Sequence, residues 1–445
     1  MKLFWIKCFI VTIATIALTW FTSRIADLSF FRVLFPETIA IQEFEFTDFA
    51  FDLTLPETLN DKITIVNIGE HDRGVIGDLV STLNNHKPAV IGIDAFFNCP
   101  VAYDTVNCPQ LRDRDGNENL RSALGEVKAL VLNALPLRSK RLSADSATIG
   151  YDSLELSDSI FSHQARNGHA FMSIAASSES EVPSCRNFDP RVTMLGGQHI
   201  NAFAVEVAML YDSVKATAFL KKFGDNDNVP INFKGNVVKY GYEDQQEFFP
   251  EPRHFLALEA DDILMNNFPS ELVTGRIVLM EYLGETLTDR AREREKFYTP
   301  LNRKKIGRTF PDMYQSVIDA NIVNMIITGD YLYELTEMQE WMLTIFICFF
   351  HVAVLLALRR RFPYLHDLAA VGLVIAIIAF MALFRLVLFT EFNVKSDLGF
   401  TIGSLALAGI VVALYHDFLD ARLLKYLHAR VKKDASEHEV AEVEK

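Results

Sequence analysis

The stretch WMLTIFICFFHVAVLLAL (residues 341–358) is the first of three closely spaced apolar runs near the end of the chain. The other two are LAAVGLVIAIIAFMALF (368–384) and LGFTIGSLALAGIVVALY (398–415), and none of the three contains a charged residue. Each approaches or meets the roughly 18 to 20 apolar residues that cross a bilayer as a helix. Three such runs with almost no amphipathic period would need an unusually large core in a soluble protein. We therefore predict membrane spans at 341–358, 368–390 and 398–416.

The connections between these runs predict their orientation. Residues 359–361 are three consecutive arginines in the first connection, whereas the second connection, residues 390–397, has no basic excess. Further arginines and lysines follow the third run, in residues 417–445. By the positive-inside rule, the arginine cluster and this tail face the cytoplasm.

The N-terminus, MKLFWIKCFIVTIATIALTWFTSR (residues 1–24), has two lysines before an apolar run and fits either a cleaved signal peptide or an uncleaved signal anchor. The run ends without a small-x-small cleavage pattern, and Trp20 suits a position at the membrane interface. We therefore favour an anchor over residues 1–23. Residues 24–340 then lie outside the membrane, and four spans leave both termini in the cytoplasm.

Composition and motifs narrow the class of protein. The chain has 445 residues, of which 50% are hydrophobic, so it is too polar for a transporter and too apolar for a purely soluble protein. The net charge of -14 argues against binding to nucleic acid. The patterns H-E-x-x-H, G-x-x-x-x-G-K-[ST] and G-x-S-x-G are absent, and the histidines show no spacing typical of metal ligands. We expect no catalysis, no cofactor and no metal.

Three cysteines fall in the predicted outer domain, where an oxidising compartment would permit a disulfide bond. Our hypothesis is a bridge between Cys99 and Cys108 across a loop that contains Pro, Asp and Asn. A bridge between Cys99 and Cys185 and the presence of free thiols remain open. Residues 177–190 are predicted to form a loop, which would place Cys185 near the surface.

The outer domain opens with a strand, a helix and a second strand. ITIVNI (63–68) and AVIGI (89–93) are runs rich in β-branched residues on either side of a helical segment, 75–84. A strand, crossover and strand of this length form a βαβ unit, which implies a parallel sheet. Further elements alternate, so we predict an α/β domain with a mainly parallel sheet. The additional strands are expected at 129–132, 169–173, 231–233 and 276–283, the helices at 199–211, 259–267 and 311–328, and loops at 136–158 and 223–229.

The order of these segments resembles that of CHASE2-type sensor proteins, over about residues 5–416. The segments that carry the resemblance are ITIVNIGEHD, HKPAVIGIDAFF, VPINFKG (similar to the central strand of the family), ALEADDILMNNFPSELVTGRIVLMEYLGET, FYTP and FPDMYQSVIDANIVNMIITGDYL. The resemblance implies an extracytoplasmic sensory domain coupled by the three-span bundle to an effector. The Gly, Arg and Trp-Pro segment usual after the first strand is absent, and no cyclase or kinase module follows the third span. A stand-alone sensor is therefore expected.

Acidic residues follow several of the predicted strands. Glu70 and His71 come after the first strand, Asp94 ends the second, and Glu281 lies in the strand at 276–283. Side chains at the carboxyl ends of parallel strands line the crevice in which α/β domains bind ligands, so these residues are candidates for a small-ligand or cation pocket. Helix capping and solvation of the surface are the alternative. Asp289 opens a charged run that is a mobile ligand loop, a surface for docking a partner, or an ordinary solvated loop or helix face.

Two polar residues lie within the predicted spans. His351 is near the middle of its span and indicates either a hydrogen bond between helices or a contact with a partner. Arg385 is expected to extend toward the outer interface. Beyond the last span, residues 419–430 have the spacing of an amphipathic helix, whose basic residues favour contact with anionic membrane lipids.

Together these observations predict a non-enzymatic sensor of a bacterial inner membrane. Its CHASE2-like periplasmic domain would bind a ligand or a periplasmic protein and signal through the membrane helices to a separate membrane or cytoplasmic protein that supplies the output. The alternative is a structural docking subunit of a multiprotein envelope complex. A sensor should bind a small molecule, whereas a subunit should co-purify stoichiometrically with fixed partners.

Overall fold

The computed structural model forms two compact units. The helical unit comprises Met1–Gln42 and Tyr333–Lys445, and the α/β unit comprises Glu43–Leu332. The structure describes residues 2–26, 46–56, 58–98, 112–138, 150–170, 172–175, 184–226, 228–243, 252–287, 296–302, 311–362 and 366–416.

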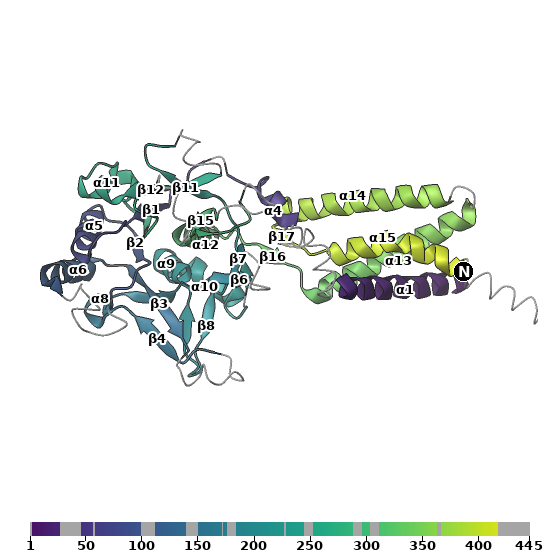
Figure 1. The fold of residues 1–445 in the computed structure, drawn as a ribbon, viewed down its shortest axis with the longest axis horizontal. Helices are drawn as coiled ribbons and strands as arrows, with labels where there is room; N and C mark the ends of the chain where they lie inside the picture. Colours follow the sequence, from purple (N-terminus) through teal and green to yellow (C-terminus); the bar gives the residue numbers. More distant parts are fainter. Residues whose placement is uncertain are drawn as a thin grey trace, which may run out of the picture. The chain divides into compact units, whose positions relative to one another are not determined.

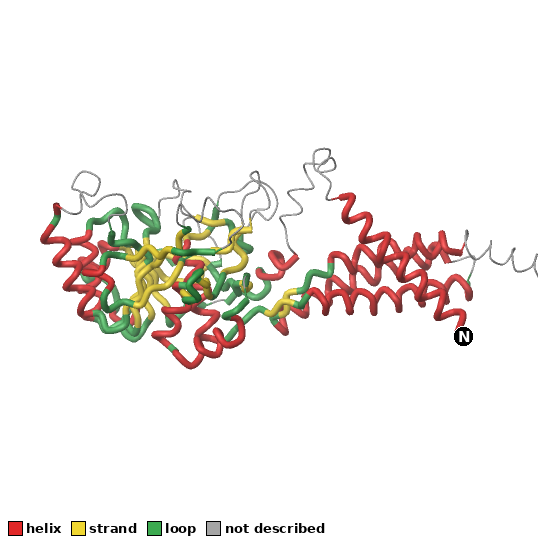
Figure 2. The backbone as a smooth tube through the Cα atoms, turned by 90° about the horizontal axis from the view of Figure 1, so that it is seen from below, coloured by secondary structure: helices red, strands yellow, loops and turns green. Residues whose placement is uncertain are grey.

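In the part of the helical unit that the structure describes, four apolar helices run alongside one another (Figures 1 and 2). Among the described residues, three segments are long and apolar enough to cross a membrane, Leu3–Arg24, Glu337–Arg361 and Leu368–Phe392. The fourth helix is shorter, with 16 described residues. The four helices are α1 (Lys2–Ala26), α13 (Glu337–Arg361), α14 (His366–Phe392) and α15 (Gly399–Leu414).

Packing in the helical unit centres on α1, α13 and α15. Val11, Cys348, Val352, Ala408 and Val412 form a buried apolar cluster between these three helices. The hydroxyls of Thr344 on α13 and Thr401 on α15 are hydrogen-bonded at 2.7 Å. Small and hydroxyl-bearing residues at such contacts are typical of helices that associate within a membrane.

The α/β unit is organised around an eight-stranded sheet with the order β11-β12-β1-β13-β2-β3-β4, in which β5 also pairs with β3. Every pairing is parallel except that of β3 with β4. The central strands are buried on both faces, which explains their continuous apolar sequences. The strands are β1 (Ile63–Asn67), β2 (Val90–Ile93), β3 (Leu130–Leu137), β4 (Ser153–Leu156), β5 (Arg166–His169), β11 (Asn236–Lys239), β12 (Arg253–Glu259) and β13 (Ile277–Glu281).

Helices cover both faces of the sheet, with α5, α6 and α11 on the opposite side from α9 and α12 (Figure 1). Gly92 in β2 permits the close approach of α9, because a Cβ at this position would lie 2.9 Å from Cζ of Phe203. The helix α12 is buried over residues 316–327, as expected for a central helix, and it carries several polar residues among its apolar ones. The helices are α5 (Arg73–Asn85), α6 (Arg114–Glu126), α8 (Ser159–Ser162), α9 (Phe203–Tyr211), α10 (Ser213–Phe223), α11 (Ala260–Leu264) and α12 (Gln315–Thr328).

Smaller elements complete both units. The α/β unit has a three-stranded antiparallel sheet β10-β7-β6 and two antiparallel pairs, and the helical unit has one parallel pair. These elements are β6 (Met172–Ala175), β7 (Ser184–Phe188), β10 (Val229–Pro230), β8 (Arg191–Thr193), β9 (His199–Asn201), β14 (Lys296–Phe297), β15 (Met313–Tyr314), β16 (Tyr333–Glu334), β17 (Val394–Lys395), the helix α4 (Phe46–Phe51) and the 3-10 helix η2 (Ser270–Leu272).

The predicted fold class is confirmed, since the domain is α/β with a mainly parallel sheet and is joined to apolar helices. The opening βαβ unit is present as β1, α5 and β2. The predicted strand at 231–233 is wrong. This segment forms no strand, because the backbone around Lys234 and Gly235 bonds to the side chain of Asn321 instead of to a neighbouring strand.

Several element boundaries also differ from the prediction. The helix expected at 199–211 begins only at Phe203, because residues 199–201 pair with β8. The strand expected at 169–173 is divided between β5 and β6. The loop expected at 136–158 contains β4, and the one at 177–190 contains β7. Cys185 therefore lies in a strand and is 0% exposed, which corrects its predicted place near the surface.

Candidate functional site

The carboxyl edge of the parallel sheet carries two groups of polar side chains. The first, the Asn67 network, consists of Asn67, Glu259 and Lys239 at the ends of β1, β12 and β11. The second, the Asp94 cluster, consists of Asp94 after β2, Asn133 on β3, and Gln315 and Asp319 on the first turns of α12. The two groups differ in how completely their hydrogen bonds are made.

All the hydrogen-bonding capacity of the Asn67 side chain is used. Its Nδ2 donates to Oε2 of Glu259 at 2.8 Å and to the carbonyl of Gly284 at 3.1 Å. Its Oδ1 accepts from the backbone N–H groups of Gly69 at 3.1 Å and Leu283 at 2.9 Å. An amide with two donated and two accepted bonds is fully satisfied.

Glu259 is equally well partnered. Its Oε1 accepts from the backbone N–H of Leu287 at 2.8 Å and lies 3.5 Å from Nζ of Lys239. Its backbone N–H donates to Asp262 in a capping box that begins α11. The Asn67 network thus fixes residues 283–287 across the ends of three strands, which is a structural role.

The Asp94 cluster joins three strands to α12. Asn133 donates through Nδ2 to Oδ1 of Asp94. Gln315 donates through Nε2 to Oδ2 of Asp94 at 3.0 Å and to the carbonyl of Ala170, just after β5, also at 3.0 Å. The side chain of Gln315 therefore ties the start of α12 to the carboxyl ends of β2 and β5.

Asp319 lies one turn beyond Gln315 on α12. Its side chain is 2% exposed, and its Oδ2 has no hydrogen-bond partner among the described residues. The same is true of Oδ1 of Asn133, which is 8% exposed, and of the buried hydroxyl of Ser316. Buried polar atoms without partners are rare and costly, so Asp319, Asn133 and Ser316 are candidates for a functional role.

Burial perturbs the carboxyl groups of this cluster. It raises the pKa of Asp94 to about 6, although the hydrogen bond from Asn133 acts in the opposite direction. The pKa of Asp319 is raised well above its ordinary value by burial and, secondly, by the negative charge of Asp94. Two neighbouring buried carboxyl groups do not both ionise readily, so the pair retains a proton at a higher pH than isolated aspartates would.

Other titratable groups nearby are neutral or partnered. Burial lowers the pKa of His169, at the end of β5, to about 4 and raises that of the Cys185 thiol to about 12. Burial also raises the pKa of Asp312 to about 6, although Thr299 donates to it from its N–H at 3.0 Å and its hydroxyl at 2.6 Å. Within the described ranges, no three His, Cys, Asp or Glu side chains are placed to hold a metal ion.

The structure places the predicted site residues in different environments. Asp94 belongs to the cluster named after it, and Glu281 is buried at the end of β13, where it pairs in register with Asn67. Glu70 and His71 lie on an exposed turn after β1, where Tyr282 donates to Glu70 at 3.3 Å. Asp289 and the cysteines of the proposed bridge, Cys99 and Cys108, lie outside the described residues, as do residues 417–445.

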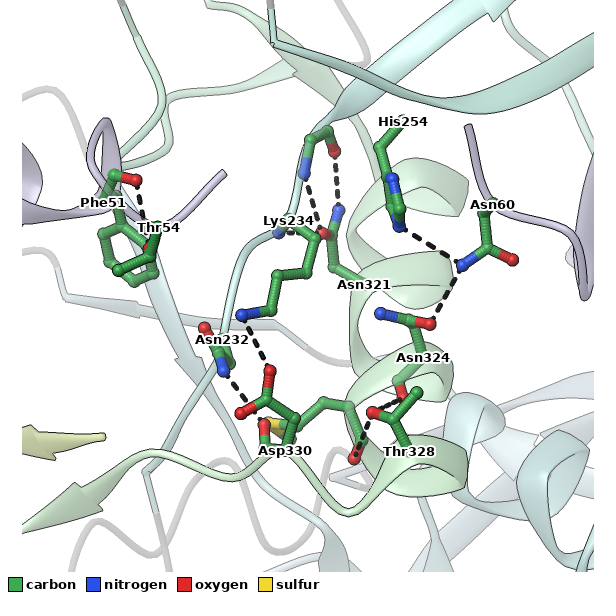
Figure 3. A network of polar contacts seen from close by, with 12 residues as sticks. Phe51, Thr54, Asn60, Asn232, Lys234, His254, Asn321, Asn324, Thr328 and Asp330 are labelled. Carbon is green, nitrogen blue, oxygen red and sulfur yellow. Dashed lines mark hydrogen bonds and ion pairs between the residues drawn. The ribbon is translucent and has the colours of Figure 1, made fainter. Parts of the chain in front are cut away.

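The second half of α12 is held by a set of contacts that we call the α12 clasp, made by Asn321, Asn232, Lys234, Gly235 and Asp330 (Figure 3). Oδ1 of Asn321 accepts from the N–H of Lys234 at 2.6 Å, and its Nδ2 donates to the carbonyl of Gly235 at 3.0 Å. Nζ of Lys234 lies 2.7 Å from the carboxylate of Asp330. Asn232 donates to the carbonyl of Asp330 at 3.0 Å.

A further chain of contacts fixes the same helix from β12. Asn60 donates to Oδ1 of Asn324 at 2.9 Å and lies 3.2 Å from Nε2 of His254 (Figure 3). Nδ1 of His254 faces the carbonyl of Thr58 at 2.8 Å, so this nitrogen carries the proton and Nε2 accepts. Burial lowers the pKa of His254, which keeps the ring neutral.

The helix α12 ends at Gly329, whose φ of 77° places it in the left-handed region that favours glycine. In the chain, residues 329–336 then lead directly to α13. In the helical unit, the first part of that helix is joined to the connector between α14 and α15. The contacts are the β16–β17 pair, a Lys395–Glu334 ion pair at 3.1 Å and a bond from the N–H of Asp397 to Glu340 at 2.7 Å.

The two polar residues of the spans are also placed. Arg385 donates to the carbonyl of Ser396, in the connector before α15, at 2.8 Å. His351 is 3% exposed, and neither of its ring nitrogens has a hydrogen-bond partner in the described part of the chain. The hydrogen bond between helices that the sequence allowed for this histidine is therefore not among the described contacts.

Sequence reasoning missed Asn67, Asn133, Gln315, Asp319 and Asn321. The last three had a usable signal, because QSVIDANIVNMIIT places polar residues inside an otherwise apolar helix. A polar side chain at such a position must find a buried partner. For Asn67 and Asn133, no signal in the local sequence separates these residues from ordinary polar residues of a strand.

The fold and site define a class of protein, a membrane protein with a parallel α/β domain and a polar site at the carboxyl edge of its sheet. The family model described as CHASE2 domain matches residues 21–356, about three quarters of the chain. The chain therefore belongs to the CHASE2 family, whose domains are extracellular sensory domains. Comparisons with curated proteins and with solved structures gave no match.

Proposed function

We propose that this chain is a non-enzymatic sensor of a bacterial inner membrane. In this proposal, the α/β unit lies in the periplasm, binds a ligand or a protein at the Asp94 cluster, and signals through α12 and the membrane helices to a separate protein. The observation that carries the proposal is the double role of α12. Its first turns contribute Gln315 and Asp319 to the cluster, and its later turns are held by the α12 clasp.

The physical basis for signalling is the stiffness of a buried helix. A helix of 14 residues is about 21 Å long at 1.5 Å per residue, and its hydrogen bonds keep that length fixed. A small displacement at Gln315 is therefore transferred to Asn321 and Gly329 rather than absorbed between them. Packed interfaces adopt discrete alternative arrangements, so a shift of this kind can act as a switch.

The contacts in the helical unit support the next step. The β16–β17 pair and the Lys395–Glu334 ion pair join the segment before α13 to the connector between α14 and α15. A displacement of residues 329–336 would therefore act on three helices at once. The arginines at 359–361 favour the cytoplasm for the far end of α13, where a partner could detect the change.

Hydrogen exchange on the full chain in mild detergent tests this proposal. Gln315→Ala removes the bridge from α12 to Asp94 and Ala170, and Gln198→Ala, at an exposed position, is the matched control. We expect Gln315→Ala to speed exchange in residues 329–336 and 393–397, and the control to leave both segments unchanged. If exchange rises around residue 94 but not in those two segments, α12 does not transmit the change.

A further inference from the structure

The Asp94 cluster contains more hydrogen-bond acceptors than donors. Both oxygens of Asp94 accept bonds, from Asn133 and Gln315. Oδ2 of Asp319 and Oδ1 of Asn133 are buried and lack a donor among the described residues. Because Asn133 is fixed on Asp94 by its Nδ2, its unpartnered oxygen lies in the same cluster. The site therefore lacks at least one hydrogen-bond donor and one positive charge.

A proton on Asp319 would correct both deficits. It converts one acceptor oxygen into a hydroxyl donor, and it removes one of two neighbouring negative charges. It also needs no additional volume. Resting on the proposed function, we infer that the Asp94–Asp319 pair is a proton-binding site, and that the ligand the α/β unit detects is the proton itself. Asp319 carries the shared proton and Asp94 remains the carboxylate, because Asp94 has two donors.

No basic side chain of the described residues neutralises the Asp94–Asp319 pair, so a proton is left to do so. Among the described residues, no lysine or arginine forms an ion pair with Asp94 or Asp319. On the elements around α12, Arg166 pairs with Glu206, Arg186 pairs with Asp48, and Lys215 donates to the carbonyl of Ile327. Other titratable groups on these elements include Tyr211 on α9, Lys221 and Lys222 on α10, His169 on β5, Cys185 on β7, Glu281 on β13, Asp312 just before β15, Tyr314 in β15, and Lys296 on β14, whose Nζ lies 4.6 Å from the centroid of the Tyr314 ring.

The sign of the pH dependence follows from the direction of the shifts. Both carboxyl groups have pKa values in the folded state above the ordinary aspartate value of 3.8. Their contribution to stability is therefore complete below about pH 4 and is lost as the pH rises through about 6 and beyond. Loss of the proton leaves two buried negative charges at the start of α12, and their repulsion loosens the contact that Gln315 makes.

Infrared difference spectroscopy of the full chain in detergent tests the site directly. A protonated carboxyl group has a carbonyl stretching band distinct from that of a carboxylate. We expect this band at neutral pH in the wild-type protein and in Asp261→Asn, an exposed control, and its loss in Asp319→Asn. Absence of the band from the wild-type protein, or its persistence in Asp319→Asn, would overturn the proposal.

Thermal unfolding gives an independent readout. Between about pH 5 and about pH 8 the unfolding midpoint of the wild-type protein should fall by about 5 °C. In Asp319→Asn the fall should be smaller, because only Asp94 is then left to lose a proton. If Asp319→Asn does not fold, Asp94→Asn serves instead. It removes the neighbouring negative charge, which lowers the pKa of Asp319, so the band of Asp319 should then disappear at a lower pH than in the wild-type protein. An unchanged midpoint in Asp94→Asn would contradict a shared site.

Failure of the proton site and failure of the proposed function are distinguishable. Hydrogen exchange in residues 329–336, measured at low and high pH, reports on signalling rather than on protonation. A protonated Asp319 whose pH titration leaves that exchange unchanged supports the proton site but contradicts transmission by α12. Absence of the infrared band together with an effect of Gln315→Ala on the same segment overturns the proton site and leaves the sensor function in place.

Discussion

The Asn67 network and the Asp94 cluster occupy the same edge of the same sheet, yet they differ in one respect. In the Asn67 network every polar atom of Asn67 has a partner, and the carboxylate of Glu259 accepts from donors on β1, β11 and the 283–287 loop. In the Asp94 cluster two carboxyl groups share too few donors. The complete network holds the strand ends in place, whereas the incomplete one is the group at which we propose that a proton binds.

The difference in hydrogen bonding predicts that substitutions in the two groups change the free energy of unfolding in different ways. Removing a member of a complete buried network leaves its partners unsatisfied, so the whole desolvation cost of those groups appears as lost stability. Removing a carboxyl group from a pair that is short of donors instead removes an unsatisfied acceptor and, once the pair has lost its proton, a like charge as well. Natural proteins commonly retain such destabilising groups at functional sites. The following substitutions test whether the two groups behave in these opposite ways.

The largest effect is expected for Asn67→Ala. It deprives Glu259 and the backbone of residues 69, 283 and 284 of their partners, so the free energy of unfolding should fall by about 3 kcal/mol. Asn84→Ala, which removes an exposed amide on α5 with a long bond of 3.4 Å, should have little effect. Thermal unfolding of the full chain in detergent measures both. Equal effects of the two substitutions would show that the Asn67 network is not structural.

Asn321→Ala tests the α12 clasp and should lower the free energy of unfolding by about 2 kcal/mol, because it leaves the backbone of Lys234 and Gly235 unsatisfied. Hydrogen exchange should rise in residues 231–235 and in the second half of α12. The exposed Asn226→Ala is the control. Protection that stays unchanged in residues 231–235 would mean that the clasp is not maintained in solution.

The sequence predicted most of the framework of this domain, for identifiable reasons. The strands β1, β2 and β13 are short apolar runs with turn residues at their ends, and α12 is long and apolar. Such segments have a single stable environment, the interior of the sheet or its covering layer. Their alternation was therefore sufficient to predict an α/β domain with a parallel sheet.

The missed elements have mixed sequences. The strand β12 reads RHFLALE, and its polar ends do not indicate that it lies beside β1 in the middle of the sheet. The helix α6 reads RDGNENLRSALGE, in which only one face is apolar. In VPINFKG, Val229 and Pro230 form β10, but the backbone of the residues that follow is bonded to the carbonyl of Arg186 and to the side chain of Asn321 from α12. A tertiary contact of this kind is absent from local sequence.

The site was only partly predictable for a related reason. The rule for strand ends found Asp94, because it depends only on the position of a residue after a strand. Asp319 and Gln315 reach the same place from α12, more than 200 residues later in the chain. Their convergence depends on how that helix packs on the sheet, and this cannot be derived from spacing in the sequence.

Matched carboxyl-to-amide substitutions compare the two groups most closely. Glu259→Gln turns one acceptor oxygen toward donors as an NH2 group, and it should lower the free energy of unfolding by about 1–2 kcal/mol. Asp319→Asn changes a group that already lacks a donor, and at neutral pH it should leave stability unchanged or raise it by up to about 1 kcal/mol. Thermal unfolding of both variants at one pH is the measurement. If Glu259→Gln and Asp319→Asn lower the free energy of unfolding by the same amount, the Asn67 network and the Asp94 cluster do not differ in the way proposed.

The smallest effect on stability is expected for His351→Leu in the helical unit. His351 resembles the Asp94 cluster in one respect, since it is buried and both its ring nitrogens lack a partner among the described residues. Replacing an unsatisfied buried polar group by an apolar one of similar size should change the free energy of unfolding by less than about 1 kcal/mol. Met342→Leu, at an exposed position on α13, is the control.

If incomplete hydrogen bonding marks function in both units, His351→Leu should weaken association with the output protein although the fold is intact. Purification in mild detergent followed by quantitative mass spectrometry would compare the proteins retained by His351→Leu, Met342→Leu and the wild-type chain. A buried histidine of this kind is costly within a membrane and is retained where it pairs or acts. Loss of a partner from His351→Leu alone would extend the comparison from the sheet edge to the membrane helices. If all three proteins retain the same partners, the link between incomplete hydrogen bonding and function is restricted to the α/β unit.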